Sequence, residues 1–223
     1  MMLSFDTHLR KRGITKYCVD GAIDPTTWRC TPLKILFLLK ETWGYQGCET
    51  FHVGQQAPRW LNDKKRAISK SVLLAAVLTK AVGYNRPLSP TEIETLKADK
   101  TALRTTLDTI AWINLKKHSG NKRSDDAVIR SEGRENAPIL REQIIELDPH
   151  VIIAGGVPSW ACLTEDLGLF DTAVDWFRFG AIVRDGKILC RGNHPAAWAG
   201  GGFNVHQLHN AIFSVYRHAH PTP

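Results

Sequence analysis

Three short, almost entirely apolar segments lie far apart in this chain and constrain its fold more than any other feature. They are residues 34–39 (KILFLL), 110–115 (IAWINL) and 151–154 (VIIA). Each has the length of a strand, and such runs are typical of strands covered on both faces. Segments with helical patterns separate or follow them: residues 59–82, 90–107, 132–147, 158–167 and 203–218. The alternation predicts an α/β fold of three layers, with helices on both faces of a central, mainly parallel sheet.

The remaining segments fit one domain. Residues 178–191 are expected to form a hairpin around Asp185-Gly186, a favoured turn pair. Residues 40–58 and 116–131 are predicted to be loops. Residues 1–33 are expected to be a lead-in that packs on the domain. The chain has 223 residues, no internal repeat and no linker, so we predict a single domain over residues 1–223.

The charge and the cysteines indicate the partner and the compartment. The net charge is +7 and the pI about 9.3, a balance that suits a polyanion such as DNA. No run of about 18 apolar residues predicts a membrane span, and the N-terminus has no signal-peptide pattern. The five cysteines include no CxxC pair, which indicates reduced thiols and a cytoplasmic protein. We expect a monomer with no cofactor and no metal.

In a parallel sheet the functional site forms in the loops beyond the carboxyl ends of the strands. The first such loop, residues 40–54 (KETWGYQGCETFHVG), offers the carboxylate Glu41 with the aromatic residues Trp43, Tyr45 and Phe51. This combination predicts a pocket with an acid and stacking aromatic rings. The alternative is a surface loop with a salt-bridged glutamate.

The second loop begins at Asn114, at the end of a predicted buried strand. A buried amide needs partners, and its donors and acceptor suit the edge of a base. The alternative is a structural asparagine that bonds its neighbours. Four cations follow it, Lys116, Lys117, Lys122 and Arg123, which either contact phosphates or form a solvated surface.

The third loop is residues 193–202 (NHPAAWAGGG). Pro195 restricts the backbone after His194, and the glycines allow a close approach to another backbone. His194 differs from the other eight histidines because it lies in a rigid loop directly after a predicted strand.

Taken in order, these motifs resemble the uracil-DNA glycosylase superfamily, most closely its iron–sulfur branch. Residues 40–44 (KETWG) resemble the branch's GEAPG motif, and residues 114–123 (NLKKHSGNKR) resemble its N-x-x-K-C-R-P-P-x-N-R stretch. Residues 140–156 are similar to its helix–strand segment, and His194-Pro195 matches the HP of its final loop. The resemblance covers about residues 34–217.

The resemblance implies a uracil-DNA glycosylase-like fold and a DNA glycosylase activity. It places His194 near the base carbonyl and Asn114 on the base edge. Glu41 is the available carboxylate to orient water or support the sugar cation, as carboxylates do in other glycoside hydrolysis. The resemblance also places Phe51 as the ring that stacks on the extruded base. Trp198 is expected to insert into the space that the flipped base leaves in the stack.

The sequence departs from that branch in two respects. His118 stands at the position of a cluster cysteine and residues 134–140 lack another, so no iron–sulfur cluster is expected. Lys40 and Trp43 replace a glycine and the proline of the GEAPG motif, which reshapes the pocket mouth and leaves the excised base open.

Several functions therefore stay open. The enzyme would repair uracil or a deaminated base, or it would serve antiviral defence by removing a bulky modified base, such as a modified cytosine, from phage DNA. A DNA-binding module without catalysis would not need Glu41 or His194. A nucleoside hydrolase on an unrelated α/β fold would act on free nucleosides without salt-dependent DNA affinity.

Overall fold

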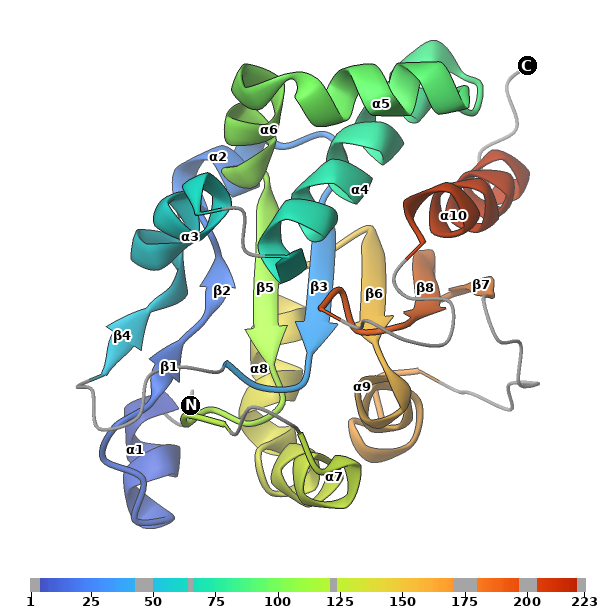
Figure 1. Cartoon of the computed structure of the whole chain (residues 1–223). Coiled ribbons are helices and arrows are strands. Elements are labelled where there is room, and N and C mark those ends of the chain that lie inside the picture. The colour runs from blue at the N-terminus through green and yellow to red at the C-terminus, as the bar shows by residue number, and fades with distance from the viewer. Residues whose placement is uncertain are drawn as a thin grey trace.

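A six-stranded sheet forms the centre of the molecule (Figure 1). The computed structural model describes residues 5–42, 50–63, 66–120, 124–170, 180–196 and 204–219. The strand order is β2-β5-β3-β6-β8-β7. The four inner strands are parallel: β3 (Ile35–Leu39), β5 (Ile110–Asn114), β6 (Val151–Gly155) and β8 (Lys187–Gly192). The two edge strands are antiparallel to their neighbours: β2 (Gly21–Ala22) and β7 (Ala181–Arg184).

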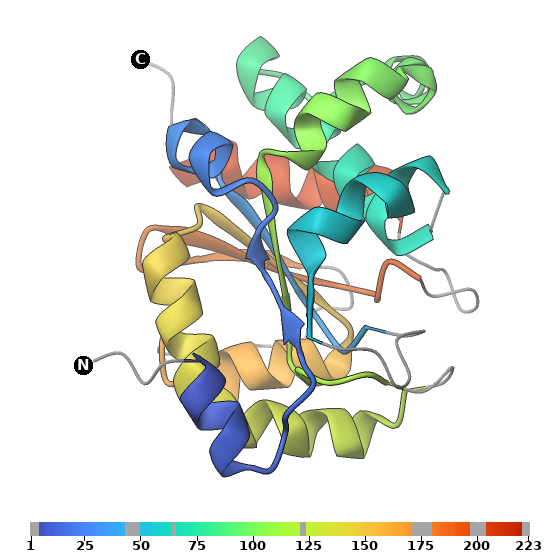
Figure 2. The ribbon, with the colours of Figure 1, turned by 90° about the vertical axis from the view of Figure 1, so that its left-hand side faces the viewer.

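Helices cover both faces of this sheet (Figure 2). One face carries α3 (Val53–Asn62), α4 (Arg66–Tyr84), α5 (Pro90–Ala98), α6 (Lys100–Leu107) and α10 (Val205–Ala219). The other face carries α2 (Pro25–Cys30), α7 (Asp126–Glu135), α8 (Ala137–Leu147), α9 (Val157–Ala161) and a π-helical turn (Cys162–Asp166). The predicted α/β class with a mainly parallel sheet between helices is therefore confirmed.

The position of β3 between two hydrophobic cores explains why its sequence is continuously apolar. Ile35, Phe37 and Leu39 point into the core beneath α4 and α10. Leu36 and Leu38 point into the core beneath α8 and α9. Since successive side chains of a strand face opposite sides, only an apolar run can fill two cores at once.

Three predicted helices are wrong in their bounds. Residues 90–107 form two helices because Asp99 ends α5 and caps α6, accepting from the Ala102 N–H at 2.9 Å. Residues 132–147 are likewise divided at Asn136 between α7 and α8. The segment 59–82 is divided too, since α3 begins at Val53 and α4 at Arg66.

Both predicted loops also contain regular structure. The segment 40–58 includes β4 (Phe51–His52) and the start of α3. In the segment 116–131, α7 begins at Asp126 because Asp125 accepts from the N–H groups of Ala127 and Val128. Caps made by aspartates are what the helical periodicity alone did not reveal.

The lead-in is more closely built into the fold than expected. It forms α1 (Phe5–Lys11), β1 (Cys18–Val19), β2 and α2. Strand β2 joins the central sheet, and β1 pairs with β4 in a separate two-stranded parallel sheet. The predicted hairpin is confirmed as β7 and β8, with positive φ at both Asp185 and Gly186.

Helix α4 is long and apolar. Its residues Ala67–Tyr84 have a mean hydropathy of 1.3. By length and composition alone, this segment could cross a membrane. About half of that segment, 56%, is buried inside the molecule. The core helix of a soluble protein has the same properties, and α4 packs against α10 and the sheet.

Candidate active site

The candidate site lies where the parallel strands end. The carboxyl ends of β3, β5, β6 and β8 share one edge of the sheet, at the lower end in Figure 1, where α7 and α9 also lie. Lys40 and Glu41 follow β3, Lys116 follows β5, and His194 follows β8. The predicted convergence of three strand-end loops is therefore confirmed for their described residues.

Glu41 is a buried carboxylate that accepts hydrogen bonds from two other side chains. Its side chain is only 4% exposed. One oxygen accepts from the Lys116 ammonium at 3.1 Å and the other from the Ser124 hydroxyl at 2.6 Å. A Cβ added at Gly120 would overlap the Glu41 carboxylate, so this glycine is needed for the close packing. Glu41 is salt-bridged, as the surface-loop alternative required, but it is inside the protein.

His194 presents one nitrogen as a hydrogen-bond donor. Its Nδ1 accepts from the Ala196 N–H at 3.2 Å, so the proton of the neutral ring is on Nε2. Burial, and then the charge of Lys40, lower the pKa of His194 to about 4, against a smaller opposing effect of Asp126. The ring is therefore neutral at pH 7, and its Nε2–H can donate to an oxygen.

Two glycines at the end of β6 connect the ends of β3 and β8. A Cβ at Gly155 would overlap Leu39 and lie 3.6 Å from the Cα of His194. Gly156 has φ +105° and donates its N–H to the Gly192 carbonyl at 2.8 Å. The stem of Lys40 lies over Gly156, and its ammonium pairs with Asp126 at 2.5 Å.

Asn114 does not present its amide to the site. The side-chain nitrogen donates to Thr42 Oγ1 at 3.1 Å and to Asp20 Oδ2 at 3.3 Å, and the oxygen accepts from the Trp112 indole at 3.3 Å. Asn114 is 1% exposed. Its contacts match the alternative of a structural asparagine, and in this conformation it has no free donor for a base edge.

Lys117 and Lys116 also differ from the prediction that they contact phosphates. Lys117 is 0% exposed and its ammonium contacts Asp20 Oδ1 at 2.7 Å and Gln143 Oε1 at 2.9 Å. Lys116 is almost as buried and is bound to Glu41. Both lysines compensate buried carboxylates, so neither ammonium faces a DNA backbone here.

Phe51 is partly buried, lies in β4 and packs against the core beneath α4. The remaining predicted site residues lie outside the described residues: Trp43, Tyr45, Lys122, Arg123 and Trp198.

The sequence did not point to four residues that hold the site together. Asp20 binds both Asn114 and Lys117, Ser124 binds Glu41, and Asp126 binds Lys40. Gly120 provides the space for Glu41. The only available signal was the sequence S-D-D at residues 124–126, which is typical of a helix start.

No metal-binding group is present among the residues that the structure describes, in the sense of three close His, Cys, Asp or Glu side chains. His118, at the position of a cluster cysteine, bonds Glu132 Oε1 at 3.1 Å. Burial raises the pKa of Cys162 and of Cys190 to about 12, so both thiols stay protonated at neutral pH.

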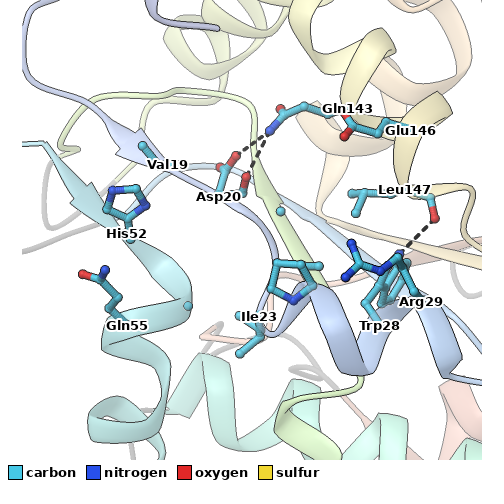
Figure 3. A pocket seen from close by; sticks show the side chains of 14 residues that line it. Val19, Asp20, Ile23, Trp28, Arg29, His52, Gln55, Gln143, Glu146 and Leu147 are labelled. Carbon is cyan, nitrogen blue, oxygen red and sulfur yellow. Dashed lines mark hydrogen bonds between the residues drawn. The ribbon is translucent and has the colours of Figure 1, made fainter.

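A separate groove of about 710 Å³ runs along the edge strand β2, between α3 and α8 (Figure 3). His52 and Gln55 line one side, and Glu146 lies on the other. Asp20 connects the groove to the site network, but its carboxylate is already bound by Asn114, Lys117 and Gln143.

No protein-family model matches this chain, and no curated protein matches it significantly.

Proposed function

We propose that this protein is a DNA glycosylase with a fold of the uracil-DNA glycosylase type. It hydrolyses the N-glycosidic bond of a base flipped out of DNA and leaves an abasic site. The observation that carries the proposal is the pair of groups at one sheet edge: the buried carboxylate of Glu41 and the neutral donor His194.

The chemistry of base release needs both groups. The bond between the sugar C1′ and the base nitrogen breaks, and its electron pair leaves with the base. The Nε2–H of His194 stabilises the negative charge on a base oxygen as it develops. Glu41 stabilises the cationic sugar and orients a water molecule, whose oxygen bonds to C1′ while its proton passes to the carboxylate or solvent. The departing base takes a proton from solvent.

The spacing of the two groups suits a nucleoside between them. Strands β3 and β8 are separated only by β6, which puts their ends about 10 Å apart. Gly155 and Gly156 lie between, and the absence of side chains there lets the residues at the ends of β3 and β8 pack closely on the end of β6. A flipped base and its sugar have dimensions of this order.

The buried ion pair Glu41–Lys116 favours a catalytic function over simple DNA binding. Moving a carboxylate and an ammonium out of water costs several kcal/mol per ion before their attraction offsets it. A module that only needs a basic surface gains nothing from the buried pair Glu41–Lys116. Release of a base from a sugar instead uses a carboxylate toward the sugar and a donor toward the base.

The test uses end-labelled duplexes, each with one uracil, hypoxanthine or 5-hydroxymethylcytosine, treated with alkali after incubation. Strand breaks at the substituted position, lost in both Glu41→Gln and His194→Ala, are the expected result. Phage DNA with bulky modified cytosines extends the panel to the antiviral alternative. DNA binding without breaks on every substrate would favour a non-catalytic module, and activity on free nucleosides alone would favour a nucleoside hydrolase.

A further inference from the structure

Lys40 is a cation whose charge acts on His194 and that the proposed mechanism leaves unused. It follows β3 directly, and its side chain is 18% exposed. Lys116 and Lys117, by contrast, are committed to the buried carboxylates Glu41 and Asp20.

The glycine turn after β6 makes room for the Lys40 side chain. A Cβ at Gly156 would lie 3.0 Å from Cε and 3.7 Å from Nζ of Lys40, a distance at which one of the two groups would have to move. The other side of the same turn contacts the loop of His194, since a Cβ at Gly155 would lie 3.3 Å from Cδ of Pro195. Lys40 and His194 therefore flank one turn.

Asp126 holds the ammonium without cancelling its field. The two charges lie 2.5 Å apart, but Asp126 is 55% exposed and its field is screened by water. At His194, Lys40 lowers the pKa by more than Asp126 raises it. The net effect of the pair at the imidazole is therefore that of a positive charge, which favours an anion next to His194.

We propose that Lys40 is a catalytic residue of this site, whose ammonium stabilises the negative charge on the departing base together with the Nε2–H of His194. The proposal rests on the proposed function, because it names a group that stabilises the base as the base receives the electron pair of the broken glycosidic bond. It also gives a role to one of the residues at which residues 40–44 depart from the GEAPG pattern.

The first test compares Lys40→Met with a matched control. Lys187→Met removes a lysine that pairs with Asp148, also at 2.5 Å and 25% exposed, at the opposite edge of the sheet. On the duplexes that the wild type cleaves, we expect Lys40→Met to slow single-turnover base release by about tenfold to hundredfold. Lys187→Met should keep the wild-type rate, and Lys40→Arg should recover most of it.

The second test does not need a substrate. Titration of the His194 ring by NMR should show a higher pKa in Lys40→Met than in the wild type, and a lower pKa in Asp126→Asn. Lys187→Met should leave this pKa unchanged. Thermal unfolding of all four variants shows whether each is folded.

These outcomes separate the inference from the proposed function. If the wild type releases no base from any duplex, the glycosylase proposal fails, while a raised His194 pKa in Lys40→Met still supports the field of Lys40 at the site. A wild-type rate for Lys40→Met on a cleaved duplex would overturn the catalytic role. An unchanged His194 pKa would overturn the placement of the charge, whatever the activity.

Discussion

At the scale of single residues, two lysines that follow Asn114 are bound to carboxylates inside the protein. Lys116 binds Glu41 and Lys117 binds Asp20, and each pair is almost wholly buried. The sequence pattern of four cations after Asn114 is the same whether the lysines point outward or inward. The positions of their partners decide between the two: Glu41 lies 75 residues before Lys116, and Asp20 lies 97 residues before Lys117.

The buried pair Lys117–Asp20 makes a stability prediction. Lys117→Met should lower the free energy of unfolding by about 3–5 kcal/mol, because it leaves the Asp20 carboxylate buried without its counter-ion. Lys97→Met is the control: it breaks an exposed pair with Glu94 and should cost less than about 1 kcal/mol. Urea unfolding followed by circular dichroism measures both. Equal losses in the two variants would show that Lys117 is not buried as described.

At the scale of elements, the connection from β5 to α7 holds the segment that follows β3. The Lys116 N–H donates to the Lys40 carbonyl, and the Gly120 N–H donates to the Thr42 carbonyl, each at 3.0 Å. Ser124 and Asp126 add side-chain contacts to Glu41 and Lys40. The orientation of both charged residues thus depends on this connection.

Gly120→Ala tests that dependence. The added methyl group would overlap the Glu41 carboxylate and displace it from Lys116, so base release should slow at least tenfold while the protein stays folded. Gly83→Ala is the control, because nothing lies within 4 Å of a Cβ at that helical position. Single-turnover rates and thermal melts are compared. An unimpaired Gly120→Ala enzyme would argue against a precise role for the Glu41 carboxylate.

The sequence predicted the elements whose signal is local. The runs at residues 34–39, 110–115 and 151–154 are strands because each must fill two cores, and the pair Asp185-Gly186 is a turn because both residues accept positive φ. Helix ends were predicted poorly where a capping aspartate divides a periodic segment, as Asp99 does. The loops were placed correctly at one edge, but the partners of Asn114 and Lys117 come from distant segments that periodicity cannot connect.

At the scale of the whole molecule, two histidines link stability to pH. Burial lowers the pKa of His209 on α10, whose Nε2 accepts from the Leu88 N–H, and the pKa of His194 is lowered to about 4. In the unfolded chain both histidines take up a proton near pH 6.5, whereas in the folded protein they do so only at lower pH. Their contribution to the free energy of unfolding is therefore fully present above pH 6.5 and is lost as the pH falls below it.

Between pH 7.5 and pH 5.0 the free energy of unfolding should therefore decrease, by about 1–2 kcal/mol from His194 alone. The carboxylates with lowered pKa values, such as Glu92 and Glu132, titrate below this window. Urea unfolding at the two pH values measures the change, and His194→Gln should reduce it. Equal stability at both pH values would mean that neither histidine is held neutral.

The net charge of +7 makes a prediction for DNA affinity. Affinity for any duplex should fall steeply with salt, and Lys122→Ala and Arg123→Ala should each reduce the slope of log K against log salt by about one. Lys116→Ala should leave that slope unchanged, since its ammonium binds Glu41. Fluorescence anisotropy across salt concentrations measures all three. Slopes that stay the same for Lys122 and Arg123 would remove this loop from the DNA contact surface.

The central claim is that Glu41 and His194 release a base from DNA, and mass spectrometry of the released bases tests it most directly. Wild type, Glu41→Gln and His194→Ala are incubated in excess over DNA that carries uracil, hypoxanthine or modified cytosines, and the free bases are quantified over time. One class of free base is expected from the wild type. Release should be about 100- to 1000-fold slower in His194→Ala, because the lost donor acts on charge that appears only in the transition state. Wild-type rates in both variants would contradict it.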